Sequence, residues 1–529
     1  MSTTRYDSRI DALAAPSADG QTLIWPNTDR LVGLAEENRR RRETYDFPIL
    51  DRPAKNWSSP TGTALLFMTG HQPAFFHPGV WAKTVAASVL ARRCGGSACF
   101  LVVDSDVPHR IAIQWPDDHG PLCRVRSTSV LPDTNWRSYE HIDGQAAKRY
   151  AALFAEIPEP WRSATTAMPT FEQGFLHSPA TDNAGYVQRW MPGIKAVERE
   201  LDVASPAFER ISELFTPQPK ACLQPALAFL AHLLLNAERF ATAYNQALAE
   251  YRTRRGIRGR HHPIPDLLTE DGRVELPFWM IRPDRPRHRL AVSQPARGEV
   301  RLWSGDAPAV ALSSAALRDN PAAALSEALG VWQVRPRALA QTMFARLFAC
   351  DLFIHGIGGA KYDQITDEII RGFFGIEPPG YVCVSATLRL PLMRFDVRES
   401  QLTAQRRKAR DLRYNPQRYL PVERIDATLR DLIAERAAAI EASEQLRRQR
   451  PKDRTDRRKA FERIHRANVE ILQAAPDLRE QARRQIDQLT ARLAHNRIAE
   501  SREWFFALYP KANLAHLRDM LRSELGPAT

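Results

Sequence analysis

Apolar runs and amphipathic stretches alternate in the middle of this chain, as strands and helices do in an α/β protein. The run 64–68 is apolar and ends in a polar glycine turn, and the run 98–103 is equally apolar. Between them, apolar residues at helical spacing predict a helix over 80–93, closed by Gly95 and Gly96. Continuous apolar strands joined by a helix indicate a right-handed crossover in a buried parallel sheet.

The same order recurs near residue 350. A helix is predicted over 336–349, followed by a strand over 351–354, a glycine-rich turn and a helix over 362–374. The apolar run 381–388 is the last predicted core strand. We therefore predict an α/β fold in which residues 61–400 form a Rossmann-like parallel sheet core with inserted connecting segments.

The other segments have different patterns. Residues 1–60 are polar and interrupted by proline, and we expect an insert in the core at about 110–330. Weaker elements are predicted as helices at 29–45 and 222–255 and as strands at 274–282 and 300–303.

After residue 400, apolar residues recur at spacings of three and four, and the charged stretch 450–454 interrupts them. The repeating positions are Ile425, Leu429, Ile433, Ala437 and Ile440, then Ile486, Leu489 and Leu493. This pattern predicts two long helices folded back as an antiparallel coiled-coil arm over 401–503, with 504–529 returning to the core.

Charge and composition narrow the class of protein. The net charge is +13, and residues 401–529 hold 28 Lys and Arg against 18 Asp and Glu. A basic, elongated segment can contact phosphates, but aromatic residues hardly interleave with these cations and no nucleic-acid-binding motif is present. We therefore interpret the charge as a solvated helical face and do not expect nucleic acid as the partner.

A length of 529 residues favours two or more packed units. The longest apolar stretch, 221–235, is interrupted by polar residues and proline, which predicts a buried helix and no membrane partner. The first residues lack an apolar signal core. Because the cysteines form no C-x-x-C pair, we expect reduced thiols in a cytoplasmic protein. The cysteines are Cys94, Cys99, Cys123, Cys222, Cys350 and Cys383.

Polar residues follow each predicted core strand, at the edge where ligands bind in α/β sheets. The first strand runs into Thr69-Gly70-His71-Gln72-Pro73, and the next ends in Asp104-Ser105-Asp106 with His109 close behind. Carboxylates suit Mg²⁺ or an incoming amine, and imidazole suits proton transfer.

The second turn, His355 to Lys361, combines three glycines with a cation at the start of a helix, which is typical of an anion site. It lacks the spacing of a Walker loop and of the G-x-G-x-x-G dinucleotide motif. Each feature also has a structural explanation, because lone histidines are often hydrogen-bonding core residues and glycine turns can serve tight packing alone.

We expect catalytic roles for His71, His77, Asp104, Asp106 and Lys361. We expect substrate or nucleotide contacts from Thr69, Gly70, Gln72, Gly79, Lys83, His109, His355, Gly356, Gly358, Gly359, Asp363 and Gln364, and the sequence identifies no metal ligand set.

In these motifs the chain resembles the cysteine-adding enzymes of bacillithiol biosynthesis, the cysteine ligase family. The turn 69–73 is similar to that family's T-G-Q-Q-[AP], the strand 100–106 to one ending in G-E-D-H-D, and 357–360 to I-G-G-P. Residues 385–388 are similar to L-S-[AY]-T-L, and 508–510 to a closing L-F-P. The resemblance implies a Rossmann-like core, a coiled-coil arm used for homodimerisation, and amide-bond formation between cysteine and an amino-sugar conjugate.

This chain departs from the family at polar positions. His71 replaces the first glutamine of the pair, the acidic run is Asp104-Ser105-Asp106, and Ala360-Lys361 replaces the proline after the two glycines. We therefore expect a changed substrate: a cytoplasmic ligase or transferase acting on a small anionic or phosphorylated metabolite, with ATP and Mg²⁺ as the candidate cofactors.

Two alternatives remain open at this point. One is a non-catalytic scaffold whose basic arm binds RNA or a protein partner. The other is an isomerase or hydrolase that uses the same crevice without a nucleotide.

Overall fold

The computed structural model describes residues 8–57, 64–117, 122–129, 136–142, 147–177, 184–218, 224–259, 261–449 and 454–526. Cys222 and most of the interruption at 450–454 lie outside these residues. The chain divides into two compact units. The larger unit comprises Met1–Trp115, Ser127–Arg389 and Arg502–Thr529, and the helical unit comprises Pro116–Arg126 and Leu390–Ser501.

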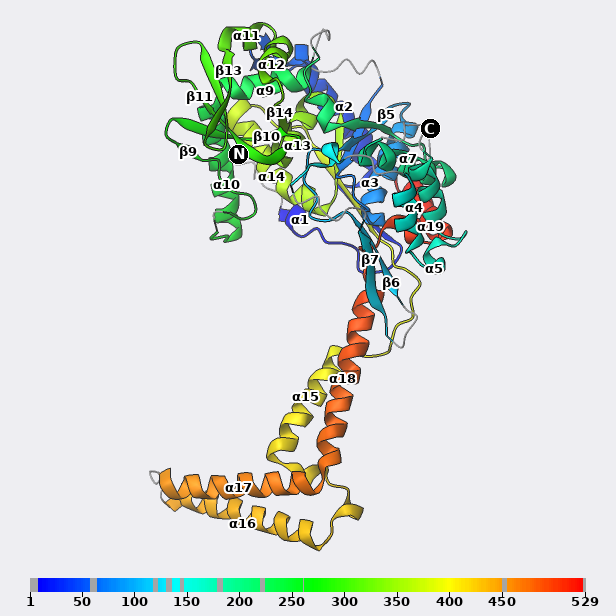
Figure 1. Cartoon of the computed structure of the whole chain (residues 1–529), viewed down its shortest axis with the longest axis vertical. Helices are drawn as coiled ribbons and strands as arrows, with labels where there is room; N and C mark the ends of the chain where they lie inside the picture. The colour runs from blue at the N-terminus through cyan, green and yellow to red at the C-terminus, as the bar shows by residue number, and fades with distance from the viewer. Residues whose placement is uncertain are drawn as a thin grey trace. The chain divides into compact units, whose positions relative to one another are not determined.

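A six-stranded, mostly parallel sheet forms the centre of the larger unit (Figure 1). Its order is β1 (Gln21–Trp25), β16 (Tyr381–Thr387), β15 (Leu352–His355), β4 (Leu66–His71), β5 (Ser97–Val102) and β8 (Ala207–Arg210). Only β1 is antiparallel to its neighbour. From β4, the chain order runs outward through β5 and β8 on one side and through β15 and β16 on the other, so the order reverses between β4 and β15.

The two helices that follow the glycine turns have different burial. Helix α3 (Pro78–Arg93) is alanine-rich, starts with proline at its first position and is buried on most of its surface. Helix α14 (Ile357–Phe374) buries one face and ends at Gly375, whose φ of 71° is the left-handed conformation that glycine adopts easily.

The predicted insert contains a second, antiparallel sheet that packs with α9 and α10 in the main apolar core. Its order is β13 (Ala307–Ser313), β12 (Glu299–Ser304), β11 (Arg285–Ser293), β10 (Arg273–Arg282) and β14 (Gln333–Pro336), with β9 (Thr269–Glu270) paired to β10. The strands predicted at 274–282 and 300–303 are β10 and β12. The short paired strands are β2 (Pro48–Ile49) with β3 (Arg52–Pro53), and β6 (Ala112–Asp117) with β7 (Arg124–Ser129).

Three predicted segments differ from the structure. The N-terminal segment is more than a polar helix, because β1 adds an edge strand to the main sheet. The helix predicted at 336–349 is shorter: α13 covers Ala338–Phe344 and a π turn covers Ala345–Ala349. The helix predicted at 362–374 begins earlier, at Ile357, because the glycine turn itself forms its first turn.

The remaining helices of the larger unit are mostly short. They are α1 (Ser8–Asp11), α2 (Leu31–Glu43), α4 (Ala147–Ala155), α5 (Glu159–Arg162), α6 (Met168–Leu176), α7 (Tyr186–Glu200), α8 (Ile211–Leu214), α9 (Pro225–Leu235), α10 (Ala237–Arg255), α11 (Ser314–Asp319), α12 (Pro321–Leu329) and α19 (Lys511–Glu524). None of the helices in the described part of the chain combines the length and apolar character needed to cross a bilayer.

The helical unit contains two helix pairs where the sequence predicts one hairpin. Helix α16 (Ala427–Gln449) pairs with α17 (Arg454–Ala474), and α15 (Glu399–Tyr414) pairs with α18 (Pro476–Ala499). Pro476 opens α18 and separates it from α17, which local apolar spacing did not reveal. In the larger unit, the segment after this region is packed into the core, where Phe506 stacks on Phe76 and Trp81.

Candidate functional site

The two glycine turns lie on adjacent strands at the point where the strand order reverses. Strands β4 and β15 pair in parallel, with Ile354 opposite Thr69, so Gly70-His71 and His355-Gly356 end at the same edge. In open α/β sheets the crevice for a ligand forms at this reversal, beyond the carboxyl ends of the strands. The structure therefore brings together two segments that are almost three hundred residues apart in the sequence.

The amino end of α14 is open. Gly356 is its N-cap in extended conformation and provides no side-chain cap. The first intrahelical bond runs from the N–H of Ala360 to the carbonyl of Gly356 at 2.9 Å, so the N–H groups of Ile357, Gly358 and Gly359 precede it. Such N–H groups and the positive end of the helix dipole attract anions.

The glycines of this turn have different roles. A Cβ on Gly359 would come within 2.7 Å of Nδ1 of His355, so packing requires glycine there. A Cβ on Gly358 would meet no atom within 4 Å, and Gly358 is exposed. Neither packing nor a positive φ explains Gly358, and the open space around it leaves the backbone accessible.

The amino end of α3 is closed by the protein itself. His77 is its N-cap, and Nδ1 of His77 accepts a hydrogen bond from the N–H of Gly79 at 3.0 Å. Nε2 of His77 lies 3.4 Å from Oε2 of Glu503. Burial lowers the pKa of His77 to about 4, so the ring is neutral and Nε2 carries its proton. Gly79 is required by packing, because a Cβ there would lie 2.7 Å from the carbonyl oxygen of Ala386.

A buried lysine lies between the two turns. Nζ of Lys83 donates to the carbonyl of Gly70 at 2.7 Å, and the lysine stem passes Gly356, whose Cβ would lie 3.8 Å from Cδ. Burial lowers the pKa of Lys83 to about 8. Burial also raises the pKa of Cys383 to about 12, against the opposing charges of Lys83 and Lys361. Both lysines are therefore close enough to Cys383 on β16 to influence the pKa of its thiol.

His355 is oriented by a carboxylate. Its Nε2 donates to Oδ2 of Asp363 at 2.9 Å, and Asp363 also accepts from Arg346 at 2.6 Å and from Oγ1 of Thr342 at 2.8 Å. Burial opposes ionisation of Asp363, but the charge of Arg346 and the hydrogen bond from His355 hold its pKa well below the usual range. Burial lowers the pKa of His355, so the ring is neutral with a lone pair on Nδ1.

His71 is a second neutral imidazole at this edge. Its Nδ1 lies 3.0 Å from the carbonyl of Gln72 and must be the donor, which leaves the lone pair on Nε2. Burial, then the charge of Lys83, lowers the pKa of His71 to about 3. The side chain is half-buried and packs edge-on against Phe76.

Asp106 connects the first turn to the second sheet. Its Oδ2 accepts from Gln72 at 3.2 Å, and its Oδ1 accepts from Arg287 of β11 at 3.1 Å. Arg287 stacks over the ring of Trp279 at 4.2 Å. The side chain of Asp106 is 39% exposed, so this carboxylate stays partly accessible to solvent.

Asp104 is differently placed. It is fully buried, and its oxygens accept from the N–H of Ser212 at 2.9 Å, Oγ of Ser212 at 2.5 Å and Nε of Arg210 at 2.7 Å. These contacts join the segment after β5 to the end of β8 and the start of α8, and they do not fit a Mg²⁺ ligand. Among the described residues, no three His, Cys, Asp or Glu side chains gather as a metal site would need.

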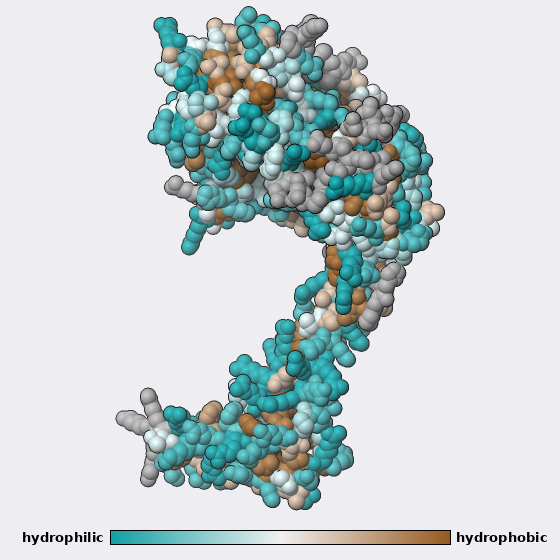
Figure 2. Space-filling view, viewed as in Figure 1, coloured by the Kyte–Doolittle hydropathy of each residue, from teal (hydrophilic) through white to brown (hydrophobic). Residues whose placement is uncertain are grey.

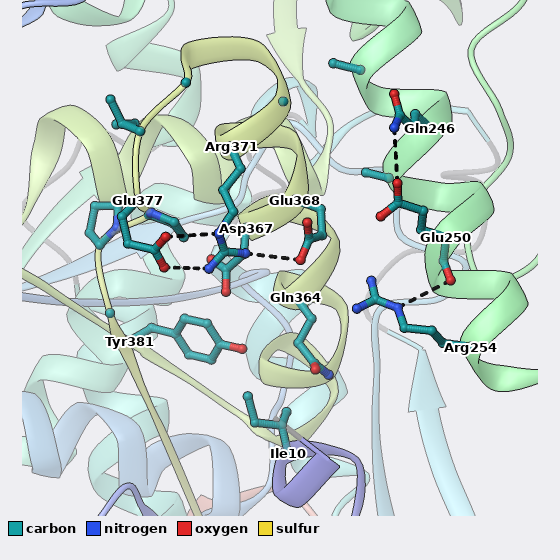
Figure 3. Close-up of a pocket in the computed structure, with 18 of the residues that line it drawn as sticks. Ile10, Gln246, Glu250, Arg254, Gln364, Asp367, Glu368, Arg371, Glu377 and Tyr381 are labelled. Carbon is teal, nitrogen blue, oxygen red and sulfur yellow. Dashed lines mark hydrogen bonds and ion pairs between the residues drawn. The ribbon is translucent and has the colours of Figure 1, made fainter. Parts of the chain in front are cut away.

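The side chains of three further predicted residues lie away from the sheet edge that the two glycine turns share. Thr69 is fully buried, and its Oγ1 donates to the carbonyl of Ile354 at 2.9 Å. His109 is exposed on the loop after β5. Gln364 lies two turns along α14, where it lines a separate cavity (Figure 3).

Sequence reasoning missed three arginines. Arg287 donates to Asp106, and Arg346 donates to Asp363. Arg502 donates to the carbonyl of Ala386 at 2.8 Å, at the carboxyl end of β16. Arg287 and Arg502 come from segments distant in sequence from the turns, and Arg346 lies in the π turn just before β15, but no motif spacing marks any of the three. The one available hint is that Arg502 lies two residues before the apolar return segment at 504–506.

No protein-family model matches this chain, and no curated protein sequence matches it.

Proposed function

We propose that the chain is an enzyme of the ligase or transferase class, with a Rossmann-like core, that binds a phosphorylated or carboxylate-bearing small molecule at the amino end of α14. The observation that carries the proposal is the open helix end beside a buried lysine at the reversal of strand order. The motifs shared with the cysteine ligase family support the same class of reaction, with a substrate changed from the bacillithiol step.

The anion site has a simple physical basis. The N–H groups of Gly358 and Gly359 donate to an oxyanion, as helix amino ends do for phosphate and carboxylate groups. Lys83 and Lys361 neutralise charge that develops on the bound group. The ammonium of Lys83 is kept in place by the carbonyl of Gly70, so the cation is positioned before the ligand arrives.

Amide-bond formation needs a proton acceptor beside the anion. The attacking amine loses a proton, the acyl carbon gains the new C–N bond, and the leaving group departs with its electron pair. Nε2 of His71 carries a lone pair at this edge and serves as the acceptor, whereas His355 is buried with its Nδ1 packed against Gly359. When bound, ATP supplies the phosphoryl group that turns a carboxylate into a competent acyl donor. Because the oxygens of Asp104 accept hydrogen bonds from Arg210 and Ser212, we assign no step to a metal held by this carboxylate.

The family resemblance also supports a cytoplasmic homodimer formed through a coiled coil of the helical unit. Helices α16 and α17 share an apolar seam in which Leu429 and Ile471 are buried. Sedimentation velocity of the full chain, with and without charge reversal on α17, tests this part separately from ligand binding.

Isothermal titration tests the anion site. Inorganic phosphate, pyrophosphate and ATP, with and without Mg²⁺, are titrated into the full chain and into the variants Lys83→Met, Lys361→Met and His71→Ala. Lys55→Met is the matched control, because Lys55 is exposed elsewhere in the larger unit. We expect heat from at least one anion, weakened in both crevice lysine variants and unchanged in the control. No heat from any anion, or equal heat in every variant, would refute the site.

A second candidate function is binding of RNA or a partner protein by the basic helical unit. On the face seen in Figure 2 these helices are mainly hydrophilic. Many of their arginines are paired along the helix, as Arg458 is with Glu462 at 3.0 Å and Arg484 with Glu480 at 2.6 Å, which reduces their attraction for phosphates. This function predicts salt-dependent RNA binding that persists in Lys361→Met and disappears when residues 421–500 are deleted.

A further inference from the structure

One buried carboxyl group of the larger unit differs from the others in its partners. Four buried Asp and Glu residues each pair with at least one arginine, and these are Asp104, Glu275, Asp351 and Asp363. Glu198 of α7 is 0% exposed, and among the described residues no Lys, Arg or His forms an ion pair with it. Because a buried charge without a paired cation is unfavourable, the fold accommodates Glu198 as a neutral group.

The two carboxyl oxygens of Glu198 have different surroundings. Oε2 accepts a hydrogen bond from Oγ of Ser205 at 2.6 Å, whereas Oε1 is buried and has no hydrogen-bond partner. A protonated carboxyl group fits these surroundings, because it carries no charge. A carboxylate does not fit them, since Oε1 then needs donors, which water supplies only after it reaches the group.

Glu198 holds the turn 201–205, which joins α7 to β8. The backbone carbonyl of Glu198 accepts from the N–H of Val203 at 2.8 Å, and its carboxyl group binds Ser205. Within this turn, Asp202 has a φ of 51°, in the left-handed region that residues other than glycine rarely adopt. The conformation of the turn therefore depends on the contacts that hold it.

Two further helices bind the same turn. Arg518 of α19 donates to the carbonyl of Leu201, and Oγ of Ser88 on α3 donates to the carbonyl of Ala204 at 2.6 Å. Helices α3, α7 and α19 lie in the same part of the larger unit (Figure 1). The turn that Glu198 holds is therefore a junction of three helices.

A cavity of about 260 Å³ lies between the turn, α3 and α19. Its lining includes Val85, Val89, Val203, Arg518 and Arg522. The turn therefore borders open space and can shift without first displacing packed side chains on that side.

The charge state of Glu198 is set by its burial. Burial raises the pKa of Glu198 to about 7, against the hydrogen bond from Ser205 and the charge of Lys195 on the same helix. The groups around α7 that are charged or titrate near neutral pH have partners of their own. They are Glu172 with Arg162 at α6, Glu140 with Arg335 and His141 with Ser138 at the 3₁₀ turn Tyr139–His141, Asp202 with Arg522, Glu200 with Lys511, and Arg518 with Asp519.

We propose that Glu198 is a pH-sensitive latch: its neutral carboxyl group holds the turn 201–205 against α7, and loss of the proton to solvent admits water to the carboxylate and releases the turn with its contacts to α19. The folded state binds this proton more tightly than the unfolded chain, in which the pKa of a glutamate is 4.5. The contribution of Glu198 to stability is therefore fully present below pH 4.5 and is lost as the pH rises to about 7.

Hydrogen exchange of the full chain, followed by mass spectrometry at pH 6 and pH 8, tests the latch. Exchange rates are corrected for the intrinsic effect of pH. The neutral fraction of a group that titrates at pH 7 falls about tenfold over this interval, so protection of peptides covering 201–206 and the end of α19 should fall about tenfold. In Glu198→Gln, which stays neutral, protection should be equal at both pH values. Glu327→Gln, at an exposed position of α12, is the control and should behave like the wild type.

Ser205→Ala keeps the test decisive if Glu198→Gln does not fold. Ser205 is exposed, and its hydrogen bond favours the carboxylate, so the variant should move the loss of protection to higher pH. Equal wild-type protection of the turn at pH 6 and pH 8 would overturn the proposal, and so would the same loss in Glu198→Gln. A transition in Ser205→Ala at the wild-type pH would do the same. None of these outcomes bears on the anion site at the amino end of α14.

Discussion

The amino ends of α3 and α14 begin from similar sequences and have opposite properties. Each helix follows a glycine turn after a parallel strand, and the two strands, β4 and β15, are neighbours in one sheet. At α3, the His77 side chain takes the N–H of Gly79, and proline occupies the first helical position. At α14, no side chain caps the helix, and two exposed glycines form its first turn.

The glycines show why the two ends differ. Gly79 lets α3 approach β16, because any side chain there would strike the carbonyl of Ala386. At Gly358, by contrast, an added Cβ would meet no protein atom within 4 Å, so the space around this glycine is open. The same residue type therefore serves packing at one helix and access to the backbone at the other. A glycine-rich turn in a sequence indicates a site only when its own chain does not fill the space that the glycine leaves.

The largest expected effect separates these roles with one methyl group. Gly79→Ala should lower the free energy of unfolding by ~1–3 kcal/mol, because a backbone carbonyl must move. Gly358→Ala should leave stability unchanged or slightly higher, since alanine favours the helix, while it weakens sulfate binding. Fluorescence-monitored urea unfolding measures the first effect, because all eleven tryptophans lie in the larger unit. Equal stability loss in both variants would remove the distinction.

The next effect concerns the cation shared by the two turns. Lys83→Met replaces a buried ammonium by an apolar chain of similar length, so the fold should persist. Sulfate affinity should fall about tenfold to a hundredfold, corresponding to the ~1.5–3 kcal/mol typical of a hydrogen bond to a charged group. Calorimetry measures this change, with the exposed Lys55→Met variant as control. A Lys83 variant that binds sulfate like the wild type would place the anion elsewhere.

Titration of Lys83 should give two opposite pH trends. Its pKa is lowered by burial from 10.5 to about 8, so above pH 8 the folded protein loses this proton before the unfolded chain does. Stability should therefore rise between about pH 8 and 10.5, because the unfolded state binds more protons there. Sulfate affinity should fall over the same range, because the binding cation is lost. Sulfate keeps its charge throughout, and both trends should vanish in Lys83→Met.

The main elements of the fold could be predicted because strong local patterns encode them. The continuous apolar runs that become β4, β5, β15 and β16 reflect burial on both faces of a sheet. Strand β8 was not predicted, because its four residues alternate between exposed and half-buried positions. Strand β1 was also missed; it is a short edge strand held by pairing with β16, which local sequence does not record.

The candidate site was predictable only in part, for the same reason. That His355 and His71 end neighbouring strands follows from parallel pairing, and the structure shows that pairing. The partners that decide what each side chain does are remote in sequence. Arg210 and Ser212 donate hydrogen bonds to Asp104, and Arg287 donates one to Asp106. No local spacing in the sequence connects these residues, so a carboxylate after a strand could not be assigned to chemistry or to packing from sequence alone.

The smallest expected effect tests whether the end of α3 is purely structural. His77→Ala removes the side chain that accepts from Gly79, which should lower the free energy of unfolding by about 1 kcal/mol, as loss of an N-cap usually does. His77→Asn should restore most of that loss, because asparagine is a strong N-cap. Sulfate binding should be unchanged in both variants, since the anion lies at the other helix. If His77→Ala instead abolished sulfate binding while His77→Asn folded normally without binding, the imidazole would contact the ligand, and the closed end of α3 would belong to the site.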